Sequence, residues 1–196
     1  MLDRSPFLIR SYEHALTDAF CDDLVANFEA IPNAPHHVMN ESWRRCRIVR
    51  IVECQARFLT ELRAGLIDVW NDYRSTADPL GVVGSNPQLE IPQVIRYLPA
   101  GAGYFHDHAD AWNTESTTRQ VSTVAYLNDV VEGGETVFPQ HGVRLQPRKG
   151  TVAIFPSSFL FTHRAEAPIS GVKYAILSWF HFHGPTTYAS VPLLTS

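Results

Sequence analysis

A histidine and an aspartate two positions apart, His108 and Asp110, are the residues of this sequence best suited to chemistry. In an extended chain, residues i and i+2 point to the same side, so their nitrogen and oxygen donors can converge on one point. A second histidine, His163, follows much further along the chain. Two histidines and one carboxylate form the donor set that holds non-haem Fe(II) and leaves positions open for substrates. The spacing predicts a metal centre built from these three side chains.

A histidine–x–aspartate pair is common by chance, so its neighbours also bear on the interpretation. His106 lacks an acid two positions on, and we expect it to be a neighbour of the site rather than a ligand. Lys173 taken alone predicts a solvated lysine on a strand. Near a metal, however, a buried cation needs an anionic partner, because an unpaired buried charge is costly. A dicarboxylate that chelates the metal at one end would provide that partner at its other end.

The bulk composition indicates a single globular domain. The chain has 196 residues, of which 45% are hydrophobic and 18% charged, which is enough for a core and too few charges for a disordered chain. The formal net charge of −4 argues against a nucleic-acid partner bound by bulk electrostatics. We therefore expect one domain over residues 1–196 and no nucleic acid.

The cysteines and the lack of long apolar runs indicate in which cellular compartment the protein is expected. The three cysteines are odd in number and form no Cys-x-x-Cys pair, which is typical of reduced thiols. The first residues do not form a secretory signal, and no stretch reaches the ~18 apolar residues of a membrane span. The sequence predicts a cytoplasmic protein without a membrane partner.

The first half of the chain is predicted to form two helices and two early strands. We expect a short strand within residues 1–12, a helix capped by Thr17, a strand over Trp43–Cys54 and a long helix over Gln55–Tyr73. Trp43–Cys54 is interpreted as a solvated edge strand. The segment Asn33–Ser42 is a loop that either covers the substrate as a lid or is a plain surface loop, and Ser75–Pro92 is expected to be irregular.

After residue 92, short apolar runs alternate with turns, a pattern typical of a sandwich or a barrel. The expected runs are 93–98, 121–127, 136–138, 143–145, 150–155, 159–162 and 172–180. Helices first and strands second predict helices packed on one face of a sheet. We therefore expect residues 1–92 to support a β core formed by residues 93–183.

The order of motifs in this second half resembles the Fe(II)/2-oxoglutarate-dependent dioxygenases of the prolyl 4-hydroxylase type. The resemblance covers roughly Gln93 to Phe180. The matching residues are Tyr97, Gly101 and Tyr104 before His108-Ala109-Asp110, then Tyr126-Leu127-Asn128-Asp129, Glu132-Gly133-Gly134-Glu135-Thr136-Val137-Phe138-Pro139, Pro147-Arg148-Lys149-Gly150, Ala153-Ile154-Phe155, His163, Pro168, Gly171, Lys173 and Trp179.

The resemblance implies a mainly β fold, a double-stranded β-helix or jelly-roll with the N-terminal helices packed on one sheet. It implies that His108, Asp110 and His163 are the iron ligands. It also implies that Lys173 pairs with the distal carboxylate of 2-oxoglutarate, supported by Tyr126, and that Tyr97 lines the same pocket. Tyr104 lies four residues before the ligand histidine, where the family has three, so one residue is inserted here.

The activity implied by the resemblance is hydroxylation of an unactivated C–H bond, with Fe(II), 2-oxoglutarate and O2 consumed to give succinate and CO2, and with ascorbate as a reductant. The first expectation for the substrate is a prolyl residue in a peptide or protein. The alternatives are a free amino acid, a small metabolite or a non-prolyl residue, a metal enzyme that needs no 2-oxoglutarate, and a jelly-roll binding protein without catalysis.

Candidate substrate contacts are residues near the ligands or on the arginine-rich strand. They are Arg119, Trp112, Tyr104, Arg45 and Arg47. Each has a plainer interpretation as a packed or solvated side chain.

Overall fold

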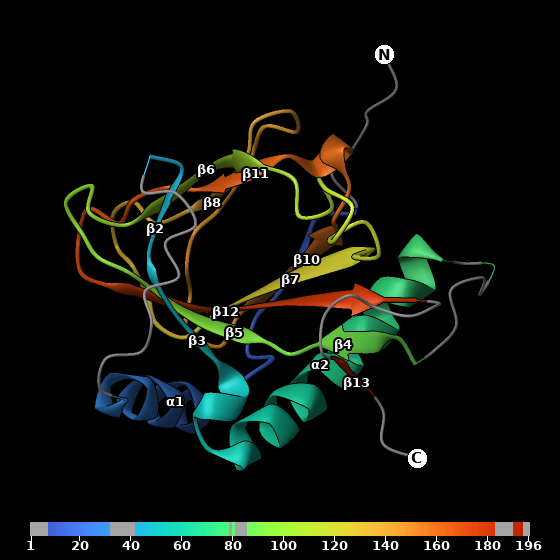
Figure 1. The fold of residues 1–196 in the computed structure, drawn as a ribbon, viewed down its shortest axis with the longest axis horizontal. Coiled ribbons are helices and arrows are strands. Elements are labelled where there is room, and N and C mark those ends of the chain that lie inside the picture. Colours follow the sequence, from blue (N-terminus) through green and yellow to red (C-terminus); the bar gives the residue numbers. More distant parts are fainter. Residues whose placement is uncertain (1–7, 32–41, 79, 81–85, 183–189, 194–196) are drawn as a thin grey trace.

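The computed structural model describes residues 8–31, 42–78, 80, 86–182 and 190–193. Two antiparallel sheets lie one above the other, and two helices cover the outer face of the larger sheet (Figure 1). This is the jelly-roll with one helical face that the sequence predicts. Among the described residues, no helix is both long and apolar enough to cross a membrane.

The larger sheet has the strand order β1-β10-β7-β12-β4-β13, and β5 joins β12 to β3. The smaller sheet has the order β2-β6-β11-β8-β9. The bounds of the strands in the larger sheet are β1 Arg10–Tyr12, β3 Arg47–Arg50, β4 Gln88–Glu90, β5 Gln93–Tyr97, β7 Val121–Tyr126, β10 Val152–Pro156, β12 Lys173–His181 and β13 Ser190–Pro192. Those in the smaller sheet are β2 Arg44–Arg45, β6 Tyr104–His108, β8 Thr136–Phe138, β9 Val143–Leu145 and β11 His163–Ala165.

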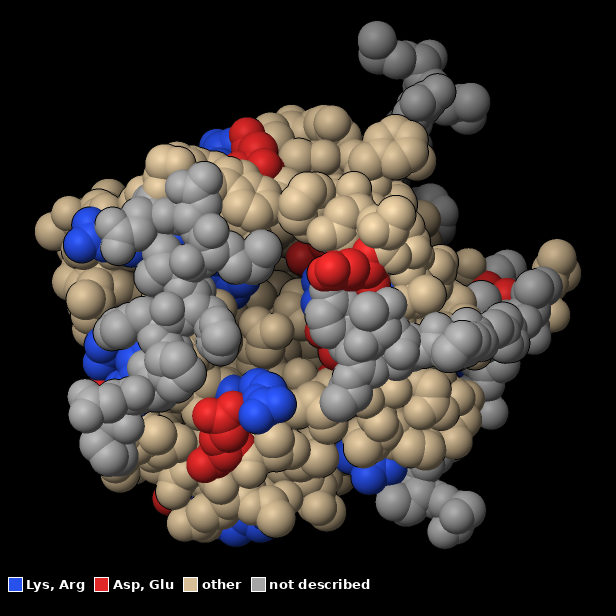
Figure 2. Space-filling model, in the orientation of Figure 1, with Lys and Arg blue, Asp and Glu red and all other residues tan. Residues whose placement is uncertain are grey.

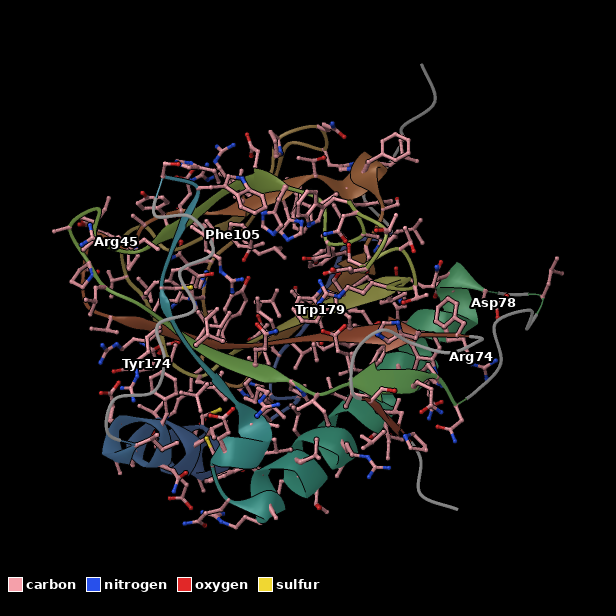
Figure 3. All side chains as sticks on the ribbon, in the orientation of Figure 1. Arg45, Arg74, Asp78, Phe105, Tyr174 and Trp179 are labelled. Atoms are coloured by element: carbon pink, nitrogen blue, oxygen red, sulfur yellow. The ribbon has the colours of Figure 1, made fainter. Side chains whose placement is uncertain are left out.

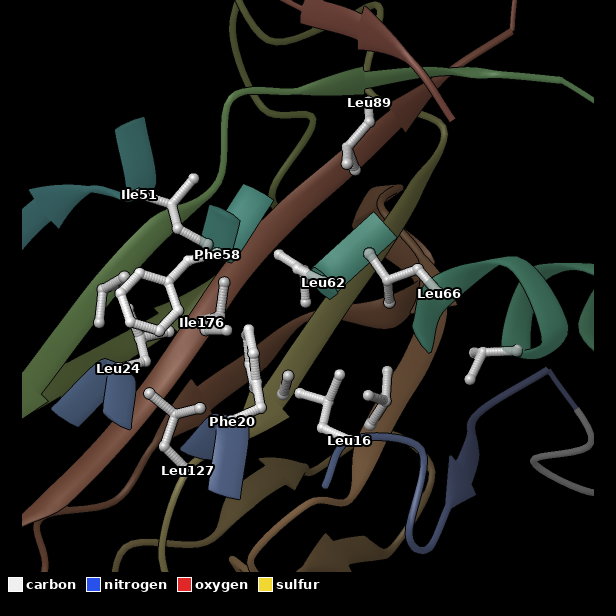
Figure 4. Close-up of a cluster of buried hydrophobic side chains, with 14 of the residues drawn as sticks. Leu16, Phe20, Leu24, Ile51, Phe58, Leu62, Leu66, Leu89, Leu127 and Ile176 are labelled. Carbon is white, nitrogen blue, oxygen red and sulfur yellow. The ribbon is translucent and has the colours of Figure 1, made fainter. Parts of the chain in front are cut away.

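The two helices form where the apolar periodicity predicts them. Helix α1 covers Asp18–Ala30, and the Thr17 side chain accepts a hydrogen bond from the backbone N–H of Phe20, which caps it. Helix α2 covers Ala56–Ala77, one turn longer than expected, and Tyr73 is still buried in the core. Their apolar faces share one core with the larger sheet, and residues from both halves of the chain contribute to it (Figure 4).

Three expectations about local structure were wrong. The Trp43–Cys54 segment is not one solvated strand. It changes sheets between β2 and β3 and then forms the 3-10 turn η1, Ile51–Glu53, and half of its residues are buried. Residues 159–162 are not extended but form the 3-10 turn η2, Phe159–Phe161. The segment Ser75–Pro92, expected to be irregular, contains the end of α2 and strand β4. The short strand expected within residues 1–12 is confirmed at Arg10–Tyr12. Most of the Asn33–Ser42 loop lies outside the described residues.

Candidate metal centre and active site

Strands β6 and β11 bring the three predicted ligands together. The two strands are antiparallel neighbours with His163 opposite His108, and Asp110 follows β6 by two residues. The Nε2 atom of His108 lies 3.6 Å from Oδ1 of Asp110, and Nε2 of His163 lies 3.7 Å from Oδ2. One donor atom from each side chain lies within 4.8 Å of the others, and all three residues are buried. The predicted convergence of the three side chains is confirmed.

Hydrogen bonds on the far side of each ring hold both imidazoles in the tautomer that a metal requires. Nδ1 of His108 lies 2.8 Å from the carbonyl oxygen of His106, and Nδ1 of His163 lies 3.1 Å from that of Phe161. A carbonyl only accepts, so each Nδ1 carries the proton and each Nε2 keeps its lone pair for the centre. Burial and the neighbouring His163 lower the pKa of His108, which favours the neutral form that binds metals.

The Asp110 carboxylate is held by a hydroxyl pair that the sequence analysis missed. Burial raises the pKa of Asp110, but the two histidines and a hydrogen bond from Ser122 outweigh it, so the pKa is lowered. Ser122 Oγ donates to Oδ2 of Asp110 at 2.6 Å, and it lies 2.8 Å from Ser157 Oγ. Ser122, Val124 and Tyr126 occupy every second position of β7 and therefore share one face of the strand. This period of two was the available sequence signal that Ser122 faces the site.

Lys173 lies beside the triad in a narrow pocket that His108, His163, Tyr97 and Thr136 also line. It is 1% exposed, and its ammonium donates to the carbonyl oxygen of Gly134 at 2.6 Å. No ion pair with a carboxylate is recorded for it within the described part of the chain. Burial lowers its pKa to about 7, with a smaller opposing effect from Glu135. An ammonium group has three donors, so Lys173 retains capacity for a buried anion.

The two predicted tyrosines surround this ammonium. The rings of Tyr97 and Tyr126 each have their centres 5.4 Å from Nζ of Lys173. The Tyr126 hydroxyl donates to Thr136 Oγ1 at 2.8 Å, and burial raises the pKa of both tyrosines, so they stay neutral. Thr136 is a further pocket residue that the sequence analysis did not single out.

These residues fit a divalent metal and a dicarboxylate. The triad offers two neutral imidazoles and one anionic carboxylate, and at the other end of the pocket none of the described residues gives Lys173 an anionic partner. The free volume between them is about 20 Å³, room for about one water molecule and too little for 2-oxoglutarate. The side chains that line the pocket must therefore move apart when 2-oxoglutarate enters.

A second cavity of about 310 Å³ opens on the other side of His108 and Asp110. It forms the hollow near the middle of the face in Figure 2. Phe105 from β6 and Trp179 from β12 line it from the two sheets (Figure 3). Trp112 lies at its mouth, is 57% exposed and packs edge-on against Trp43 with ring centres 5.8 Å apart. The position and aromatic lining of this cavity suit a substrate whose reacting atom approaches the triad.

Arg119 lines this cavity in a fixed position. Its guanidinium lies 3.7 Å from the ring centre of Trp179, and it donates to both oxygens of Glu90 at 2.6 and 2.8 Å. His181 completes the cluster, with Nε2 3.2 Å from the same carboxylate. Arg119 and Trp112, predicted as substrate contacts, are thus at the cavity, and Glu90 was not anticipated.

The other predicted substrate contacts lie outside the cavity lining. Arg47 donates to the carbonyl oxygens of Phe28 and Ile31, so it holds the end of α1. Arg45 is exposed at the rim of the molecule (Figure 3), and Tyr104 packs on His106. Successive residues of a strand face opposite sides. On β2 it is Arg44, not Arg45, that faces inward and lines the cavity.

Comparisons with known proteins agree with this geometry. Residues 92–181 match the family described as the 2OG-Fe(II) oxygenase superfamily. Prolyl 4-hydroxylase subunit alpha-1 of Gallus gallus is 34% identical over 86 residues, which cover 40% of this chain and 17% of that protein. The chain therefore spans about a sixth of the length of this relative.

Solved structures show the same fold. The viral collagen prolyl hydroxylase of Paramecium Bursaria Chlorella virus-1, in complex with 2OG, has a TM-score of 0.68 and 20% identity over 88% of this chain and 95% of that chain. The prolyl hydroxylase of Trichoplax adhaerens, in complex with a peptide fragment of the hypoxia inducible factor oxygen degradation domain, has a TM-score of 0.69 and 17% identity over 89% and 84% of the two chains. Residues 92–181 thus match the 2OG-Fe(II) oxygenase superfamily, and they contain all three residues of the buried triad. At 20% and 17% identity, the two solved structures show that the chain shares their fold.

Proposed function

We propose that this protein is an Fe(II)- and 2-oxoglutarate-dependent dioxygenase that hydroxylates a prolyl residue in a peptide or protein and releases succinate and CO2. The observation that carries the proposal is the position of Lys173. Within the described part of the chain this buried ammonium pairs with no carboxylate, and it lines one pocket with His108 and His163, two members of the triad that can share a metal. A metal-binding protein that needed no dicarboxylate would have no use for this costly buried cation.

Each part of the site has a distinct role. His108, Asp110 and His163 would hold the iron, and Ser122 orients the carboxylate. The bound iron would supply activation of O2, coupled to oxidative decarboxylation of 2-oxoglutarate. Lys173 would bind the distal carboxylate of 2-oxoglutarate by charge-assisted hydrogen bonds.

The surroundings of these residues position the substrate and exclude water. The Tyr126 hydroxyl, already bonded to Thr136, keeps that end of the pocket polar. Arg119 and Trp112 would contact the substrate in the larger cavity, whose aromatic lining suits the compact apolar ring of proline. The relatives that are named for prolyl hydroxylation support this substrate, and the Trichoplax structure supports a peptide.

The cellular setting is part of the proposal. The free cysteines Cys21, Cys46 and Cys54 suit a reducing compartment, and we propose the cytoplasm. Ascorbate would serve as the reductant that keeps the iron in its Fe(II) state.

The test is mass spectrometry of proline-containing peptides after incubation with the protein, Fe(II), 2-oxoglutarate and ascorbate. We expect one added oxygen on proline and an equal amount of succinate. Lys173→Ala should abolish both, yet the variant should still bind metal, because Lys173 is not a ligand. Succinate release with free amino acids but with no peptide would refute a peptide substrate. Unchanged turnover in Lys173→Ala would refute the role given to that residue.

A further inference from the structure

Arg44 is a buried cation in the larger cavity that the proposed reaction does not use. It is 6% exposed, and its Nη2 atom has no hydrogen-bond partner among the described residues. Its Nε–H donates to the sulfur of Cys46 at 3.2 Å, and its guanidinium lies 4.5 Å from the ring centre of Phe105. The side chain is thus fixed at one end while a donor remains unused at the other.

No described side chain neutralises this charge. Burial raises the pKa of the Cys46 thiol, so the sulfur is neutral at physiological pH. The Tyr97 hydroxyl nearby is neutral as well, because burial raises its pKa. The carboxylate that acts on Arg44 from a distance is Asp110, which belongs to the triad. With metal and 2-oxoglutarate bound, the positive charges of Lys173 and the divalent ion would balance the negative charges of Asp110 and the doubly charged 2-oxoglutarate. The charge of Arg44 would then remain without a partner.

The other arginines of the cavity differ in this respect. Arg119 is bonded to both oxygens of Glu90, and Arg50 donates to Glu53 at 2.7 Å on the exposed rim. Leaving a buried charge without a partner is costly, and the cost is recovered when an anion binds. A planar guanidinium favours a carboxylate, with which it makes short charge-assisted hydrogen bonds.

We infer that Arg44 is a specificity-determining residue that binds a carboxylate of the substrate in the larger cavity. The inference rests on the proposed function and narrows its substrate to a molecule with an acidic group near the reacting carbon. The acidic group must lie near the reacting carbon because Arg44 and the metal ligand His108 both contact the same ring. The Phe105 ring stacks on His108, with ring centres 3.5 Å apart, and its centre lies 4.5 Å from the Arg44 guanidinium. A terminal carboxylate on the reacting residue and an acidic side chain on the next residue both satisfy this geometry.

The test is a binding experiment that does not depend on turnover. Trp43, Trp112 and Trp179 line the cavity, so their fluorescence should respond to occupancy. The probes are two matched pairs: acetyl-Ala-Pro against its amide, and acetyl-Ala-Pro-Glu-Ala-amide against the same peptide with Gln. We expect the carboxylate member of at least one pair to bind about tenfold more tightly to the wild-type protein, or more.

Arg44→Gln should abolish this preference, and Arg44→Lys should keep part of it because the charge remains. Arg45→Gln is the matched control on the same strand: its side chain is exposed outside the cavity, so the preference should persist. Equal binding of all neutral and anionic probes to the wild-type protein, or an unchanged preference in Arg44→Gln, would overturn the inference. A loss of 2-oxoglutarate affinity in Arg44→Gln, measured by calorimetry, would assign Arg44 to the co-substrate and overturn it too.

The two proposals fail in different ways. Hydroxylation of a neutral prolyl peptide, together with no carboxylate preference, would preserve the dioxygenase and remove the role of Arg44. A carboxylate preference that depends on Arg44, together with no succinate release from any substrate, would preserve the binding site and remove the proposed reaction.

Discussion

At the scale of single residues, the site is built around charges that are expensive to bury. Lys173 is 1% exposed, and burial depresses its pKa to about 7. Its protonated form in the empty pocket is therefore destabilised, and a bound carboxylate would restore it. The same logic applies to Asp110, whose carboxylate is kept anionic by the two histidines and Ser122. Each group is costly alone and is stabilised by the ligand or partner that defines its role.

This environment of Lys173 predicts how 2-oxoglutarate binding depends on pH. Near pH 7 and above, a growing fraction of Lys173 is neutral in the empty pocket, whereas the bound carboxylate raises its pKa. Binding must then take up a proton, so the affinity should fall as pH rises from about 7 to 9, by up to about tenfold per unit. Calorimetry in buffers of different ionisation enthalpy measures this uptake directly.

Lys173→Arg is the control, because a guanidinium stays charged throughout this range. The affinity of this variant for 2-oxoglutarate should depend little on pH. Binding to the wild-type protein without proton uptake at pH 8 would contradict the depressed pKa of Lys173.

At the scale of elements, strand β7 connects the core to the chemistry by alternation. Val121 and Ala125 face the helices and belong to the main core, whereas Val124 and Tyr126 face the interior of the jelly-roll. Ser122 lies on the interior side and donates to Asp110. One strand thus packs the helical layer with one face and positions a metal ligand with the other.

Ser122→Ala should lower metal affinity by about 10- to 100-fold, because the Asp110 carboxylate loses the hydrogen bond that orients it. The fold should persist, since the change removes one hydroxyl. Metal competition titrations measure the loss.

Thr123→Val is the matched control on the opposite face of β7. Thr123 bonds to Ser178 at 2.5 Å and not to the triad, so metal affinity should stay near that of the wild-type protein. Equal metal affinity in the Ser122→Ala and wild-type proteins would show that Asp110 needs no such support.

At the scale of the whole molecule, the helices and the β core depend on each other. The main core includes Leu16, Phe58 and Leu62 from the N-terminal half together with Ile176 and Phe180 from β12. β12 also carries Lys173. The helical layer therefore supports the strand that positions the co-substrate residue.

Within the helical layer, Gly65 in α2 lies close against the segment that leads into α1. A Cβ atom there would lie 2.7 Å from the carbonyl oxygen of Ala15 and 2.7 Å from Cδ2 of Leu16. Gly65→Ala should therefore destabilise the protein by about 1–3 kcal/mol, although alanine favours a helix by about 1 kcal/mol over glycine. Urea unfolding measures the change.

Ala64→Gly, on the exposed neighbouring position, calibrates helix propensity alone and should cost about 1 kcal/mol. A stabilising effect of Gly65→Ala would mean that α2 does not pack this tightly on the segment that leads into α1.

The sequence by itself determined the fold class, the two helices and the triad with Lys173, because these follow from local periodicity, fixed spacing and a family motif order. It could not decide which arginine faces the cavity. Arg44, Arg45 and Arg47 look alike along the chain, and only the crossing of β2 and β3 between two sheets buries Arg44 beside Phe105 and places Arg47 under α1. The roles of Thr136 and Glu90 were likewise decided by tertiary structure, because their partners lie on distant parts of the chain and such contacts leave no spacing in the sequence. For Ser122, alternation along β7 could indicate the face, but only the fold brings its hydroxyl to Asp110.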